Sequence, residues 1–152
     1  MFARAAVLIA LVLALAAAGC GGSDDGRDTY VKSLNKAQTG LQQRFTQLGA
    51  RITPTSSAKQ DQRTLEAYES AVGTTVKDLR AIDPPSGFET LHSRFIGQVA
   101  GYGAALRTAR SRIDSDDPRA ILAAQGRLKT AVQQTGQRLN ATIEAINKKL
   151  KG

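Results

Sequence analysis

The sequence contains few of the residues that most often build catalytic, redox or haem sites. Its 152 residues include one cysteine, one histidine, no tryptophan and one methionine, which is the initiator. A lone cysteine excludes an internal disulfide. The lack of a Cys-x-x-Cys-His segment and of an internal methionine excludes covalent haem attachment of that kind and histidine–methionine ligation of haem. Gly-x-Ser-x-Gly elements and phosphate-binding Gly-rich loops are also missing. We therefore expect a protein that is not an enzyme and carries no cofactor.

Acidic residues are also in short supply. There are 21 Lys and Arg against 13 Asp and Glu, which gives a formal net charge of +8. The hydrophobic fraction of 41% and the charged fraction of 22% suit a small globular domain rather than a disordered chain. A basic balance favours anionic partners. No aromatic residues are interleaved with the basic ones for base stacking, so the sequence predicts no nucleic-acid binding.

The first 19 residues have the pattern of an export signal. Arg4 supplies the positive charge, and an uncharged apolar run extends from Ala5 to Ala18. A helix over that run would be roughly 21 Å long, too short for about 30 Å of bilayer hydrocarbon. Small residues then lead directly to Cys20, the only cysteine. This arrangement predicts a signal peptide over residues 1–19 that is removed on export.

The segment Ala17-Ala18-Gly19-Cys20 resembles the lipobox of bacterial lipoproteins, with alanine in place of the usual leucine three residues before the cysteine. The resemblance implies cleavage before Cys20 and attachment of diacylglyceryl to its sulfur. The mature chain would then be anchored to the extracytoplasmic face of the cell membrane, through two or more acyl chains. The alternative is an ordinary secretory signal in which Cys20 is incidental. Residues 20–28 would form the lipidated cysteine and a flexible tether.

Four helical patterns follow, and residues 29–152 are expected to form one domain. The first runs from Val31 to Ile52 with apolar residues at heptad spacing, and the second from Leu65 to Ile82. The third runs over 88–113 and the fourth over 121–150, and proline-containing segments separate all three pairs. Four long helices with short connections must alternate in direction. The sequence therefore predicts an all-α, up-down-up-down four-helix bundle with coiled-coil-like seams.

Two capping boxes are expected at helix starts. Ser57 and Gln60 have the spacing for one before the second helix, and Ser86 and Glu89 for another before the third. The break between these helices, Leu79-Arg80-Ala81-Ile82-Asp83-Pro84-Pro85 with Leu91-His92 and Phe95 beyond it, resembles small uncharacterised lipoproteins of high-GC Gram-positive bacteria. That resemblance implies the same fold and location and no particular activity.

His92 and Glu89 are the only candidates for a metal site on a helix. Carboxylate-bridged di-metal proteins use Glu-x-x-His motifs on bundle helices, but they need two such motifs. This chain has one histidine, Glu89 is expected to be a cap, and the pair Glu66 and Glu69 lacks a histidine partner. The sequence therefore predicts no metal site.

Glycines inside the third helix allow two interpretations. Gly97 and Gly101 form a GxxxG pattern, although Arg94 and Gln98 make the segment too polar to cross a membrane. Close helix packing is one interpretation. The other is a small gap in the bundle that admits an apolar ligand.

A basic surface is expected near the break between the third and fourth helices. Five arginines and one lysine gather there in the sequence, namely Arg107, Arg110, Arg112, Arg119, Arg127 and Lys129, and three aspartates in 114–117 offset part of their charge. The surface that could contact an anionic partner comprises Arg107, Arg110, Arg119 and Arg127.

Two functions are compatible with these features. The first is a non-enzymatic, lipid-anchored module of the cell envelope that binds an anionic envelope polymer or another envelope protein. The second is a carrier or sensor of a small apolar ligand held in the helix bundle. The cysteine anchor and the net charge favour the first.

Overall fold

The computed structural model describes residues 25–51, 57–113 and 118–151. They form four helices, α1 (Asp25–Gly49), α2 (Ala58–Arg80), α3 (Glu89–Ile113) and α4 (Pro118–Lys151). No strand occurs among them. The all-α four-helix class predicted from the sequence is confirmed.

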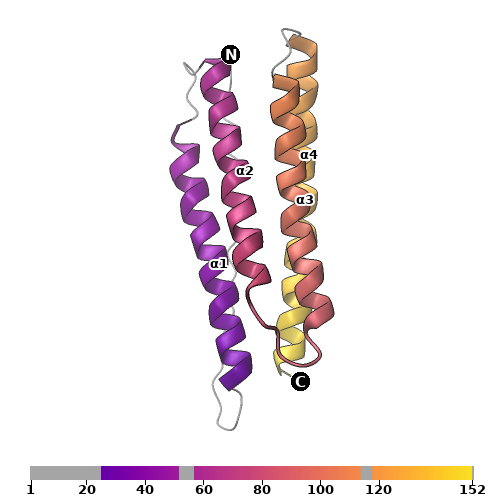
Figure 1. Cartoon of the computed structure of the whole chain (residues 1–152). Helices are drawn as coiled ribbons and strands as arrows, with labels where there is room; N and C mark the ends of the chain where they lie inside the picture. The colour runs from indigo at the N-terminus through magenta and orange to yellow at the C-terminus, as the bar shows by residue number, and fades with distance from the viewer. Residues whose placement is uncertain (1–24, 52–56, 114–117, 152) are drawn as a thin grey trace.

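The helices run up, down, up and down along one axis (Figure 1). Each consecutive pair packs side by side, and α3 contacts both α2 and α4. The start of α1, the connection between α2 and α3, and the end of α4 lie at one end of the bundle (Figure 1). With 34 residues, α4 is about 51 Å long.

Helix α2 begins as its sequence predicts. The Ser57 hydroxyl accepts a hydrogen bond from the Gln60 backbone N–H at 3.3 Å, and the Gln60 side chain accepts one from the Ser57 N–H at 2.7 Å. Both halves of the capping box are therefore present.

The start of α3 differs from the expected Ser86–Glu89 box. The Glu89 carboxylate accepts its hydrogen bond from the Gly87 backbone N–H at 3.0 Å, and Glu89 itself is the first residue of the helix. Gly87 has a φ of +83°, a left-handed conformation that glycine adopts without a Cβ penalty. This turn places Phe88 in the core with 1% of its surface exposed. The Glu89 carboxylate binds the backbone N–H of Gly87, one residue after the Ser86 N–H that the spacing predicted.

Helix α1 begins earlier than expected. The tether was predicted to extend to residue 28, but the helix already includes Asp25. Asp25 and Asp28 lie in its first turn, where carboxylates interact favourably with the positive end of the helix dipole. Only four residues, 21–24, therefore separate Cys20 from the helix, and the five steps from Cys20 to Asp25 span at most about 18 Å when extended.

The core follows the predicted heptad positions closely. Each helix contributes apolar residues that were expected to face inward, and the least exposed side chains come from all four helices. The buried cluster contains Tyr30, Leu34, Leu65, Val72, Leu79, Phe88, Phe95, Val99, Leu106, Leu139, Ile143 and Ile146. The fourth helical pattern predicted from the sequence includes Ile121 and Gln125, but their side chains lie outside the described part of the structure.

Candidate functional site

The signal peptide and Cys20 fall outside the described residues, so the lipid-anchor prediction stays a prediction. None of the described helices combines the length and apolar character that a membrane span requires.

His92 lies in the core at the end of the bundle where α1 begins, with only 4% of its surface exposed. Its Nε2 is 3.0 Å from the carbonyl oxygen of Leu79, and its Nδ1 is 3.2 Å from the Tyr30 hydroxyl. Because a carbonyl oxygen can only accept, Nε2 must carry the proton, and Nδ1 then accepts from Tyr30. Both ring nitrogens are therefore used to join α1, α2 and α3.

The protonation states of this pair follow from their burial. Desolvation lowers the pKa of His92 from its ordinary value, against a smaller opposing effect of the Leu79 carbonyl. Desolvation also raises the pKa of Tyr30 to about 12. A neutral imidazole and a protonated phenol are the states that this hydrogen-bond chain requires.

The Glu89 carboxylate is also engaged, in its bond to the Gly87 N–H. This hydrogen bond and the one to its own backbone N–H lower the pKa of Glu89. Within the described part of the chain, no group of three or more His, Cys, Asp or Glu side chains is arranged to hold a metal ion.

Two of the four arginines expected to form the anionic-partner surface point toward α2. Arg107 Nε donates to Glu69 Oε1 at 2.7 Å. Arg110 lies 3.5 Å from the second oxygen of Glu69 and 3.6 Å from Glu66. Glu66 and Glu69 thus offset the charge of these two arginines.

Arg127, in contrast, lies on the other side of α3. It makes no ion pair with any described residue and borders a hollow between α3 and α4, opposite Arg112. Arg119 is exposed near the start of α4. The four arginines therefore do not form one continuous patch, since α3 separates Arg107 and Arg110 from Arg127.

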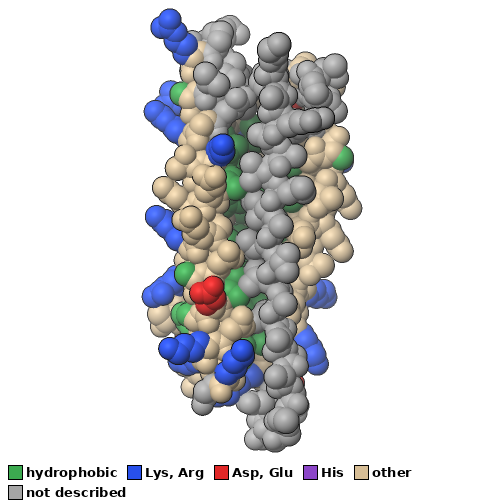
Figure 2. All heavy atoms as spheres, turned by 180° about the vertical axis from the view of Figure 1, so that it is seen from behind, with side chains coloured by type: hydrophobic (Ala, Val, Ile, Leu, Met, Phe, Trp, Pro, Cys, Tyr) green, Lys and Arg blue, Asp and Glu red, His purple; other side chains and the backbone are tan. Residues whose placement is uncertain are grey.

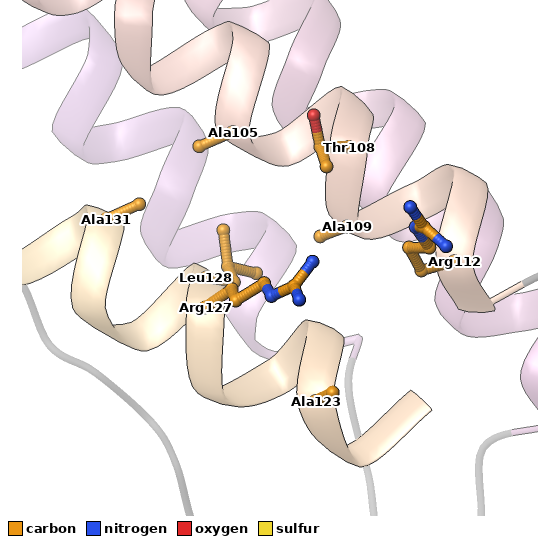
Figure 3. A pocket seen from close by; sticks show the side chains of 8 residues that line it. All are labelled: Ala105, Thr108, Ala109, Arg112, Ala123, Arg127, Leu128 and Ala131. Carbon is orange, nitrogen blue, oxygen red and sulfur yellow. The ribbon is translucent and has the colours of Figure 1, made fainter. Parts of the chain in front are cut away.

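The hollow at Arg127 has a volume of about 300 Å³ (Figure 3). Leu128 and Arg127 project from α4 into the space, and Ala105, Thr108 and Ala109 border it from α3 (Figure 3). Because half of its lining side chains are alanine, little fills the gap between the helices. We name it the alanine pocket, and it is lined by Ala105, Thr108, Ala109, Arg112, Ala123, Arg127, Leu128 and Ala131.

A second hollow of about 340 Å³ lies next to the first and shares Ala131 with it. It is the space beside Gly97 and Gly101, where a Cβ would meet nothing within 4 Å. Its other lining side chains are polar. We name it the arginine pocket, and it is lined by Arg94, Gly97, Gln98, Gly101, Ala131, Gln134, Thr135 and Arg138.

The net charge is concentrated on the helices that form these pockets. Helices α3 and α4 hold eleven Arg and Lys and two Asp and Glu, a net charge of +9. Helices α1 and α2 hold eight and six, a net charge of +2. Basic side chains correspondingly gather along the α3–α4 edge of the molecule, on the left in Figure 2. The two acidic residues, Glu89 and Glu144, lie toward the end of the bundle at which α1 starts.

No family model matches the chain, and no match was found among curated proteins or solved structures.

Arg94, Arg112 and Arg138 were not among the residues that the sequence predicted to contact an anionic partner. The signal was present, because Gly97, Gly101, Ala105 and Ala109 recur every four residues and mark one face of α3. The sequence did not show that α4 packs on that face without filling it.

Proposed function

We propose that this protein is a lipid-anchored, non-enzymatic binding module of the cell envelope whose α3–α4 face contacts an anionic partner. The observation that carries the proposal is the charge distribution, +9 on α3 and α4 against +2 on α1 and α2. Between Glu89 and Glu144, the described parts of these helices contain no carboxylate. A face of one sign raises the local concentration of oppositely charged ligands and speeds their association.

The position of the face favours an extended polymer over the lipid headgroups. Arg138 lies 13 residues before the end of α4, and Arg127 lies 24 residues before it. These separations correspond to about 20 and 36 Å along the helix. Helix α1 starts at the end of the bundle where α4 finishes, so a tether from a lipidated Cys20 would join the bundle at that end. A polymer that extends outward from the membrane would pass along this face.

The arginines expected to contact the polymer are those that border the two pockets, Arg94, Arg112, Arg127 and Arg138. Arg107 and Arg110 contribute less, because Glu66 and Glu69 offset their charge.

Binding to polyphosphate, measured by calorimetry on the mature chain, tests the electrostatic part of the proposal. Replacing all four pocket arginines with alanine should abolish binding at about 50 mM salt. A matched control replaces four basic residues of α1 and α2 with alanine, namely Lys32, Lys36, Lys59 and Arg63. This variant loses the same charge and should retain most of the polyphosphate binding. Wild-type binding should weaken steeply with salt, since about 0.1 M salt screens exposed charges beyond about 10 Å. Equal losses in the two variants would show that net charge alone is responsible.

The anchor requires a separate test. Intact-mass analysis of the membrane fraction should find a chain that begins at Cys20 and carries diacylglyceryl, and Cys20→Ser should abolish the modification. A wild-type chain that begins elsewhere or carries no lipid would contradict the anchor.

The alternative function, a carrier of a small apolar ligand, has support at a different place from the one expected. The space beside Gly97 and Gly101 exists, but arginine, glutamine and threonine side chains line it. The apolar lining belongs to the alanine pocket, nearer the start of α4.

A further inference from the structure

The two pockets on the α3–α4 face are adjacent and have opposite character. They share Ala131, so a ligand can extend from one into the other without leaving the groove. The first is lined mainly by alanine and leucine, although Arg112 and Arg127 also border it, and the second mainly by arginine, glutamine and threonine. A groove with mostly small apolar side chains at one end and mostly polar ones at the other matches a ligand with the same division.

The polar end offers a set of groups that converge from two helices. Arg94 comes from α3 and Arg138 from α4, and neither forms an ion pair with a described residue. Guanidinium groups bind phosphate and carboxylate through paired N–H donors. The two arginines are therefore suited to hold one anionic headgroup between the helices.

An uncommon feature marks this polar end. The side-chain oxygen of Gln98 is buried and has no hydrogen-bond partner among the described residues. Buried polar atoms are almost always paired, and an orphan needs a partner from water or a ligand. Gln98 lines the arginine pocket, so a water bound beside a ligand headgroup, or a protonated phosphate oxygen, can donate the missing hydrogen bond.

The apolar end is open because its side chains are small. Ala105 and Ala109 face Ala123 and Ala131 across the groove, with Leu128 between them (Figure 3). The volume of about 300 Å³ lies at the lower end of the range for small-molecule pockets, about 300–1,000 Å³. That space suits a single hydrocarbon chain.

We propose that the α3–α4 groove binds a single-chain anionic amphiphile. The phosphate or carboxylate headgroup lies between Arg94 and Arg138, and the chain passes Ala131 into the alanine pocket. This site goes beyond the proposed function, because it needs neither the anchor nor polymer binding, although both uses share the arginines.

The test uses alkyl phosphates below their micelle concentration and the unlipidated mature chain (residues 20–152 with Cys20→Ser), which contains all four helices. Affinity from calorimetry should rise about two- to fourfold per methylene from hexyl to decyl phosphate, as burial of the chain requires. Inorganic phosphate and decanol, each representing half of the ligand, should bind at least about tenfold more weakly than decyl phosphate. Decanoate in place of decyl phosphate tells a carboxylate headgroup from a phosphate, and either one should show the chain-length dependence.

Variants then assign each half of the ligand to its pocket. Ala105→Leu should remove the dependence on chain length and leave the affinity for inorganic phosphate unchanged. Ala104→Leu, on the exposed neighbouring residue of α3, is the matched control and should change neither. Arg138→Gln should weaken all phosphate probes while decanol binding stays the same.

NMR chemical shifts of the wild-type chain give a measurement that needs no variant. Decyl phosphate should shift the amides of Gly101, Ala131 and Thr135 more than those of α1. Shifts concentrated elsewhere, an affinity independent of chain length, or a chain-length dependence that survives Ala105→Leu would overturn the proposal. Binding of decyl phosphate without binding of polyphosphate would refute only the polymer contact.

Discussion

The Tyr30 hydroxyl lies 3.2 Å from His92 Nδ1, and this contact joins α1 to α3 across 62 residues of sequence. The two rings also meet edge to face, with centroids 5.5 Å apart. The Leu79 carbonyl oxygen accepts a hydrogen bond from the other imidazole nitrogen, Nε2. One histidine thus links three helices at the end of the bundle where α1 begins.

Removing the Tyr30 hydroxyl should therefore destabilise the bundle. Tyr30→Phe leaves Nδ1 of His92 buried without a donor, which costs about 1–3 kcal/mol of unfolding free energy. Thr29→Ala, at the exposed neighbouring residue, is the control and should be nearly silent. Urea unfolding of the unlipidated mature chain measures both changes. Equal stabilities of wild type and Tyr30→Phe would show that the hydrogen bond contributes nothing.

Stability should decrease in mildly acidic solution. The pKa of His92 is lowered in the folded state by burial, so the unfolded chain binds a proton more readily. The stability that this difference supplies is fully present above the unfolded pKa of about 6.5 and is lost as the pH falls through the lower folded pKa. Unfolding midpoints at pH 7.5 and 5.5 measure the effect, and His92→Gln should flatten the dependence. An unchanged slope in that variant would assign the effect to other groups.

Two glycines of α3 should respond to alanine in opposite ways. At Gly103 an added Cβ would lie 3.1 Å from Val72 Cγ1, and Val72 is almost fully buried and stiff. Gly103→Ala should therefore destabilise by about 1–3 kcal/mol through overpacking. At Gly97 a Cβ meets nothing within 4 Å, so alanine should stabilise by roughly 0.5–1 kcal/mol. Thermal denaturation followed by circular dichroism gives both signs, and a gain at Gly103 would contradict the packing of α2 on α3.

The core register can be tested with a charge. Leu139 is 9% exposed, and Leu139→Asp should cost at least about 3 kcal/mol, because it removes a core side chain and buries a carboxylate. Lys36→Asp, at an exposed position of α1, should change the free energy of unfolding by no more than about 0.5 kcal/mol. Comparable losses at both positions would mean that the assigned inward faces are wrong.

The sequence by itself determined the four helices, their alternating direction and most of the core. These features depend on short-range patterns, namely heptad spacing, proline breaks and the Ser57 cap, which act within a few residues. The sequence pattern was wrong in one detail of the start of α3. The Glu89 carboxylate accepts a hydrogen bond from the Gly87 N–H, whereas the capping-box spacing predicted the Ser86 N–H.

Only the tertiary structure decided which side chains meet. Arg107 and Arg110 looked like free surface cations in sequence, but Glu69 and Glu66 lie against them because α2 packs beside α3. The imidazole of His92 found its two partners 13 and 62 residues away. A gap beside Gly97 and Gly101 was one of two interpretations of the sequence, and the polar lining of that gap comes partly from α4. Helical periodicity fixes which face of a helix is buried, whereas the partner of each residue depends on the axial offset between neighbouring helices, which no local pattern encodes.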